Sequence, residues 1–144
     1  MRTTRPNRLA LAVAAGIAMV LSIPTAASAA YWGDETDYAV SSSGPTGDYV
    51  CATHTGVTAC FKPDGDVLYV KDRLEDGYAA VAIWDHVVEG NYRRSGACVN
   101  KLGADHWGQC NKDFYEAGDL QFAAARYNNG NPVDRGNWVW ESIS

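Results

Sequence analysis

The chain has 144 residues, with 17 acidic and 12 basic side chains and a formal net charge of −5. That length suits a single domain, and an acidic excess without a basic cluster argues against nucleic acid or an anionic membrane as a partner. No apolar run reaches the roughly 20 residues that a membrane-spanning helix needs.

Residues 1–30 have the organisation of a secretory signal peptide. Three arginines within the first eight residues precede the apolar run Leu9–Ile23, and small residues follow at 27–30. This order predicts cleavage after Ala29 or Ala30 and export to the extracellular space. The exported part keeps nine basic and seventeen acidic residues, so its net charge is −8.

The exported part divides into two predicted regions. Residues 31–48 are expected to form a flexible N-terminal arm, because 41–47 read Ser-Ser-Ser-Gly-Pro-Thr-Gly. Residues 49–144 are expected to form a single disulfide-stapled β-domain, in which short apolar runs alternate with turn signals. The predicted strands are 49–53, 57–61, 67–72, 78–87, 92–100, 105–110, 119–127 and 137–142. Segments rich in Gly, Asn, Asp and Pro separate them, including a plain loop at 128–132. Strands at this spacing predict an all-β fold, a small antiparallel β-sandwich or barrel.

The four cysteines are Cys51, Cys60, Cys98 and Cys110. An even number in an exported chain predicts two disulfides, and no C-x-x-C pair indicates a metal or redox motif. We expect Cys51–Cys60 and Cys98–Cys110, because each pair encloses a turn-rich segment and a hairpin brings its ends together. Loop entropy alone does not choose this pairing over the other two connectivities.

No catalytic residue, metal ligand or cofactor is assigned. Neither G-x-S-x-G nor H-E-x-x-H occurs. His54, His86 and His106 have no partner at a readable spacing, and we expect them at the surface near strand ends. Asp85 precedes His86, but neighbours in a strand point to opposite faces. A carboxylate pair of the glycosidase kind remains open, since acidic residues are plentiful.

The aromatic residues give the first candidate binding site. Tyr78 and Trp84 share one face of the predicted strand 78–87, whereas Ala79, Val81 and Ile83 form the other. We assign the aliphatic face to the core, so Tyr78 and Trp84 are expected to form an outward stripe. Such a stripe can stack on sugars or anchor a protein. A two-layer fold that buries both faces is the alternative.

A second candidate is the loop between Cys98 and Cys110. Lys101 and Leu102 lie near its predicted tip. A loop tied by a disulfide is preorganised for binding, as are the reactive loops of secreted protease inhibitors.

The whole chain resembles the small, exported, two-disulfide proteins of actinobacteria: a signal, an arm, then about a hundred residues rich in Gly, Trp and Tyr. This resemblance rests on composition and architecture, so it transfers no functional residue. The first hypothesis is therefore a secreted, non-enzymatic protein that binds a cell surface, a glycan or another protein. The alternatives are an inhibitor of an extracellular enzyme acting through Lys101-Leu102, and a small secreted hydrolase.

Overall fold

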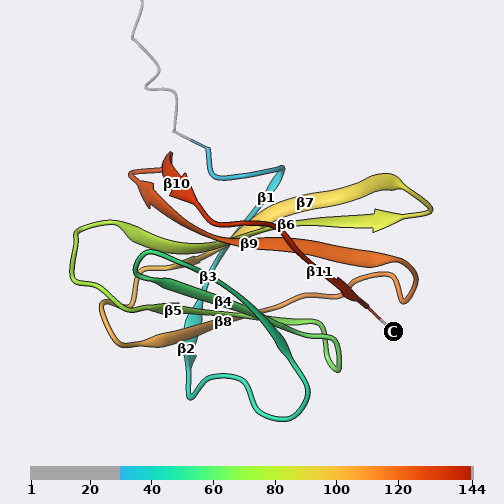
Figure 1. Ribbon diagram of the computed structural model, residues 1–144, viewed down its shortest axis with the longest axis horizontal. Coiled ribbons are helices and arrows are strands. Elements are labelled where there is room, and N and C mark those ends of the chain that lie inside the picture. The colour runs from blue at the N-terminus through green and yellow to red at the C-terminus, as the bar shows by residue number, and fades with distance from the viewer. Residues whose placement is uncertain (1–29, 144) are drawn as a thin grey trace, which may run out of the picture.

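The computed structural model describes residues 30–143, so the predicted signal peptide, apart from Ala30, lies outside the described residues. Within that range the chain forms eleven strands and no helix. Two sheets pack face to face as a sandwich, which confirms the predicted all-β class (Figure 1). No helix among the described residues is long and apolar enough to cross a membrane.

The first sheet is the upper layer in Figure 1 and the second sheet the lower one. The first sheet has the order β1 (Glu35–Tyr38), β7 (Asn91–Asn100), β6 (Ala79–Val88), β9 (Asp119–Asn128) and β10 (Asn131–Arg135), with β11 (Val139–Ser142) also beside β9. The second has the order β2 (Val40–Ser42), β8 (Trp107–Asn111), β5 (Val67–Asp72), β4 (Val57–Lys62) and β3 (Val50–His54). All described pairings are antiparallel except that of β1 with β7.

The prediction of a flexible arm over residues 31–48 is wrong. This segment supplies an edge strand to each sheet, β1 beside β7 and β2 beside β8. Tyr31 is buried, and the backbone at Gly33 has φ of +69°, where a Cβ would lie 2.4 Å from the backbone of Ser95. Ser41 and Ser42, the first two residues of the breaker-rich stretch, belong to β2, because exposed sheet edges offer unpaired backbone groups that a short polar segment can join.

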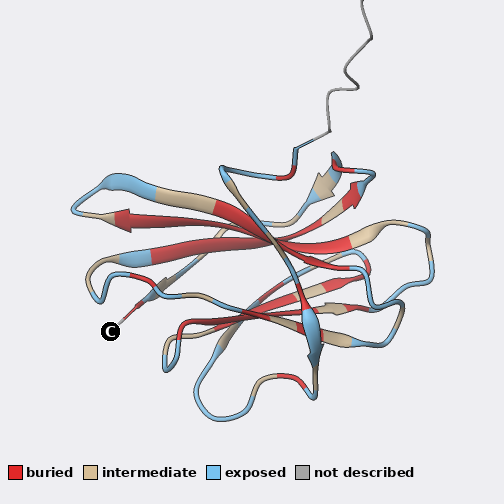
Figure 2. Cartoon of the chain, turned by 180° about the vertical axis from the view of Figure 1, so that it is seen from behind, coloured by how far each residue is buried: buried red, intermediate tan, exposed pale blue. Residues whose placement is uncertain are grey.

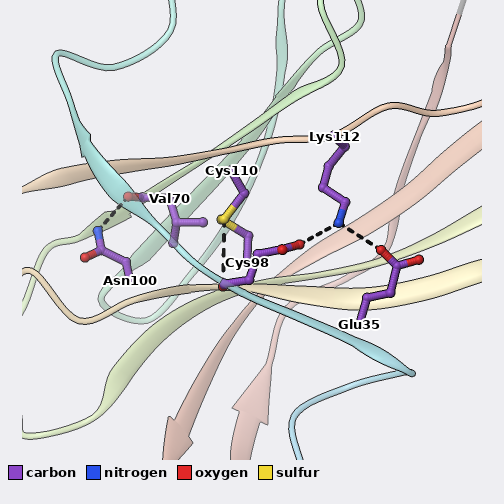
Figure 3. The surroundings of a disulfide bond; sticks show 7 residues. Glu35, Val70, Cys98, Asn100, Cys110 and Lys112 are labelled. Carbon is purple, nitrogen blue, oxygen red and sulfur yellow. Dashed lines mark hydrogen bonds and ion pairs between the residues drawn. A yellow bond between two sulfur atoms is a disulfide. The ribbon is translucent and has the colours of Figure 1, made fainter.

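Both predicted disulfides are present, but they play different roles. Cys51–Cys60, the hairpin disulfide, joins directly opposed residues of β3 and β4, with their Cα atoms 4.0 Å apart. Cys98–Cys110, the inter-sheet disulfide, joins β7 of the first sheet to β8 of the second (Figure 3). The second pairing is therefore correct, whereas the hairpin proposed as its reason is wrong.

Strand β6 is buried on both faces, and Figure 2 shows it buried along most of its length. The face that carries Ala80, Ala82 and Trp84 packs into the core between the sheets. The opposite face, with Val81 and Ile83, packs into a second apolar cluster on the outer side of the first sheet. The assignment of the aliphatic face alone to the core is therefore wrong, because β6 is a central strand covered on two sides.

The segment 128–132 is a hairpin turn rather than a plain loop. Asn129 and Gly130 both have positive φ, 49° and 81°, and they connect β9 to β10. Consecutive positive-φ residues are characteristic of the type I′ hairpin, for which Asn-Gly is the preferred sequence.

Candidate functional site

The structure brings together two of the four predicted binding residues. Tyr78 and Lys101 line the same open hollow of about 410 Å³ at one end of the sandwich. Leu102 follows Lys101 and is 39% exposed. Trp84 is fully buried, so the predicted outward stripe of Tyr78 and Trp84 is wrong.

Four segments that are distant in the sequence form the hollow. They are the start of the described chain, the loop from β5 to β6, the loop from β7 to β8, and the β9–β10 turn. Beside the aliphatic Leu74, Ala79 and Ala104, their aromatic and polar lining side chains are tyrosines, carboxylates, amides and one lysine: Tyr31, Asp72, Glu75, Tyr78, Asn100, Lys101, Tyr127 and Asn129.

Buried Asn100 holds the loop from β7 to β8. Its Nδ2 donates to the backbone oxygens of Val70 (2.7 Å) and His106 (2.9 Å), and its Oδ1 accepts the Leu102 N–H at 2.9 Å. The Asp105 N–H donates to the backbone oxygen of Asp72. The loop that carries Lys101 is thus fixed at both ends, which lowers the entropy lost when it binds a partner.

The ring of Tyr78 lies against a charge network formed by Arg126, Asp134 and Asp76. The Arg126 guanidinium lies 5.2 Å from the Tyr78 ring centroid. Arg126 donates to both carboxylate oxygens of Asp134 and, at 3.0 Å, to Asp76. These hydrogen bonds raise the pKa of Arg126 and lower that of Asp134. A guanidinium clamped in this way is a rigid support for an aromatic ring.

Two further tyrosines form another wall of the hollow. The rings of Tyr31 and Tyr127 lie 5.0 Å apart, and both residues are buried. Burial raises the pKa of the Tyr127 hydroxyl. Tyr31 and Tyr127 therefore add only a small exposed aromatic surface to the hollow, beside the more exposed ring of Tyr78.

Asp72 lines the hollow and is only 8% exposed. Burial is the main reason that its pKa is raised, and nearby Asp76 and Asp105 add to this. Its Oδ1 accepts the Leu74 N–H at 3.0 Å, and a carboxylate has further lone pairs that can accept hydrogen bonds. Asp72 can therefore accept a hydrogen bond from a bound hydroxyl group.

The histidines occupy three different environments. His86 is 1% exposed, and its Nε2 lies 3.1 Å from the Ala117 carbonyl oxygen, so its predicted surface position is wrong. Its ring packs against Phe114 between the sheets, whereas Asp85 bonds Trp32 on the outer side. The predicted divergence of Asp85 and His86 is confirmed.

Sequence reasoning missed one histidine–carboxylate pair. His54 Nε2 lies 3.2 Å from Asp134 Oδ1. Because residues 54 and 134 come from β3 and β10 of different sheets, no sequence spacing could indicate the pair. Asp134 is already bound by Arg126, so this carboxylate serves the charge network that supports Tyr78. Among residues 30–143, no group of three His, Cys, Asp or Glu side chains could hold a metal ion.

A second charge cluster lies beside the inter-sheet disulfide. Lys112 donates to Glu35 and Asp37, and Arg94 donates to both oxygens of Glu35 (Figure 3 shows Lys112 with Glu35). The hydrogen bonds from Arg94, and then from Lys112, hold the pKa of Glu35 at about 2. Two cations balance two anions here, so the cluster ties β1 to β7 and β8.

Comparison with protein families, with characterised proteins and with solved structures gave no match for this chain.

Proposed function

We propose that this is a secreted, non-enzymatic protein that binds a neutral glycan in the hollow. The observation that carries the proposal is that Tyr78, Tyr31 and Tyr127 line the same hollow as Asp72. A sugar ring has an apolar C–H face, which packs on an aromatic ring, and a rim of hydroxyl groups, which need acceptors and donors. Fixed rings combined with a few polar groups are the usual composition of a small-ligand site.

The charges support a neutral ligand over an acidic one. The exported chain carries a net charge of −8, and Asp72 and Glu75 both line the hollow. The ammonium group of Lys101, the one cation among the lining residues, lies 4.9 Å from the Tyr38 ring centroid and is engaged there. An anionic sugar would meet mostly like charges, whereas neutral hydroxyl groups can donate to the carboxylates.

The experiment is a binding screen of the exported chain against neutral oligosaccharides and insoluble neutral polysaccharides. Each glycan that binds in the screen is then titrated by calorimetry against Tyr78→Ala, Tyr78→Phe and the control Tyr92→Ala. The Tyr92 side chain is 67% exposed on β7 and does not line the hollow. Tyr78→Ala should weaken binding by about 2 kcal/mol, or roughly 30-fold, because a packed aromatic anchor is lost.

Tyr78→Phe keeps the stacking surface, so it should retain most of the affinity, and Tyr92→Ala should bind like the unmodified chain. Absence of binding to every neutral glycan, or full affinity in a folded Tyr78→Ala variant, would overturn the proposal.

One observation favours inhibition of an extracellular enzyme as the second candidate. The Lys101-Leu102 loop is anchored by Asn100 and starts three residues after Cys98 of the inter-sheet disulfide. Against it, the Lys101 amine lies over the Tyr38 ring instead of projecting towards an enzyme. Inhibition of any member of a panel of secreted proteases, abolished by Leu102→Ala, would favour this candidate over glycan binding.

A further inference from the structure

The outer face of the first sheet carries a layer of aromatic rings that continues from the hollow. Its floor consists of small and aliphatic side chains, all fully buried: Val81, Ile83, Ala97, Val99, Ala123 and Ala125. Tyr31 belongs both to this cluster and to the lining of the hollow. In Figure 1 the segment before β1 runs along the side of the upper layer that faces away from the second sheet.

The rings that cover this floor are fixed in place. The indole N–H of Trp32 donates to Asp85 Oδ1 at 2.9 Å, and Gln121 donates to the other oxygen of Asp85. The Trp32 and Trp138 ring centroids lie 5.5 Å apart. A ring whose orientation is already fixed loses little entropy when a ligand packs on it.

Three of the rings remain accessible. Trp32 is 38% exposed, Trp140 is 52% exposed and Tyr38 is 58% exposed. Trp140 lies opposite Gln121 in the β11–β9 pair, and Tyr38 lies opposite Val99 in the β1–β7 pair. Opposed residues in neighbouring strands share a face, so these side chains emerge on the outer face of the first sheet. We name Trp32, Tyr38, Trp138 and Trp140 the aromatic strip.

The charges near the strip argue against an acidic polymer. Its two neighbouring cations already lie over rings, Lys101 over Tyr38 and Arg135, at 5.1 Å, over Trp138. The exported chain is strongly acidic overall. A surface of accessible rings suits an uncharged chain with alternating apolar and hydroxylated surfaces, and exposed aromatic patches of this kind mark interaction sites.

We infer that the ligand of this protein is a long neutral polysaccharide chain, which occupies the hollow with one segment and the aromatic strip with the next. This inference rests on the proposed glycan-binding function and adds the length of the ligand to it. Tyr31 of the hollow and Tyr38 of the strip have ring centroids 6.4 Å apart, so one continuous chain can contact both regions.

The test compares ligand lengths. Gluco-oligosaccharides from the β-1,4, β-1,3 and α-1,4 series, from disaccharide to hexasaccharide, are titrated against the unmodified chain, Tyr78→Ala, Trp140→Ala and Tyr38→Ala. Tyr115→Ala is the control, since its side chain is 70% exposed on the loop from β8 to β9 and belongs to neither region. Thermal melts of each variant establish that it is folded.

In the series that binds, affinity should rise at least tenfold from the shortest to the longest ligand. Trp140→Ala and Tyr38→Ala should each remove most of this gain, and Trp140→Ala should leave disaccharide binding unchanged, whereas Tyr78→Ala should weaken every length. If affinity does not rise with ligand length, or if both strip variants keep the rise, the inference about the strip is overturned. Disaccharide binding would then still support the proposed function. No binding at any length, together with no binding in the neutral-glycan screen, overturns both the inference about the strip and the proposed function.

Discussion

Replacing Trp84 with Ala tests whether this side chain belongs to the core or to a binding surface. Trp84 is 0% exposed, and its ring lies 5.1 Å from that of Phe114. The Lys112 ammonium lies 4.9 Å from the Trp84 ring centroid, and the Arg94 guanidinium lies 5.8 Å from it. Trp84→Ala therefore removes a large buried surface and the aromatic partner of two cations.

The expected loss is large on the scale of the whole domain. Truncating a buried Trp to Ala costs about 3–5 kcal/mol, and the loss of cation–π contacts adds about 1 kcal/mol. A total of about 5 kcal/mol is comparable with the complete stability of a marginal domain, which is about 5–15 kcal/mol. For a domain of this size the melting temperature should fall by roughly 20 °C.

Thermal melts followed by circular dichroism provide the measurement, with two matched variants. Trp140→Ala removes the same side chain from a half-exposed position and should cost no more than about 1 kcal/mol. Trp84→Phe keeps an aromatic ring and removes an indole N–H that is buried without a partner, so it should cost less than half as much as Trp84→Ala. If Trp84→Ala melted within about 4 °C of the unmodified chain, the core assignment of this face of β6 would be refuted.

Three other perturbations have distinct expected outcomes. Glu35→Gln should destabilise the chain by about 1–2 kcal/mol at pH 7, a value reduced for the one-third exposure of this side chain. Because the pKa of Glu35 is lowered to about 2, its contribution is present above about pH 4.5 and lost as the pH falls towards 2. Urea titrations of both chains should therefore converge at acid pH, and a gap that stays constant would contradict this cause. Replacing both cysteines of the inter-sheet disulfide with Ala should cost more than the same change at the hairpin disulfide, although chain entropy assigns about 3 kcal/mol to each. Calorimetric melts giving the opposite order would show that joining the two sheets adds nothing to the stability of the chain. Deleting residues 30–42 removes β1, β2 and the ring of Tyr31, so the melting temperature should fall by more than about 10 °C; an unchanged melt would restore the view of this segment as a dispensable arm.

The local sequence determined the strands and the disulfide partners. Alternating apolar runs between turn signals located eight strands, and Val67–Asp72 has the predicted bounds. The disulfide pairing followed from closeness in the sequence, because short loops bring cysteines together whichever sheets their strands join. The Asn129-Gly130 signal for the β9–β10 turn was also present in the sequence, although the segment was interpreted as a loop.

Tertiary structure alone decided which surfaces remain free. A strand pattern shows that two faces alternate, but it does not show how many layers cover them, and so Trp84 was placed outside. Edge strands such as β1 owe their regularity to the neighbour that they pair with, so the polar segment around Glu35 carried little signal of its own. The hollow combines side chains from residues 31 to 129, because sheet packing brings together loop ends that are separated along the chain. The sequence indicated Tyr78 and Lys101 as separate candidate binding residues. Their convergence depends on long-range contacts that no local pattern encodes.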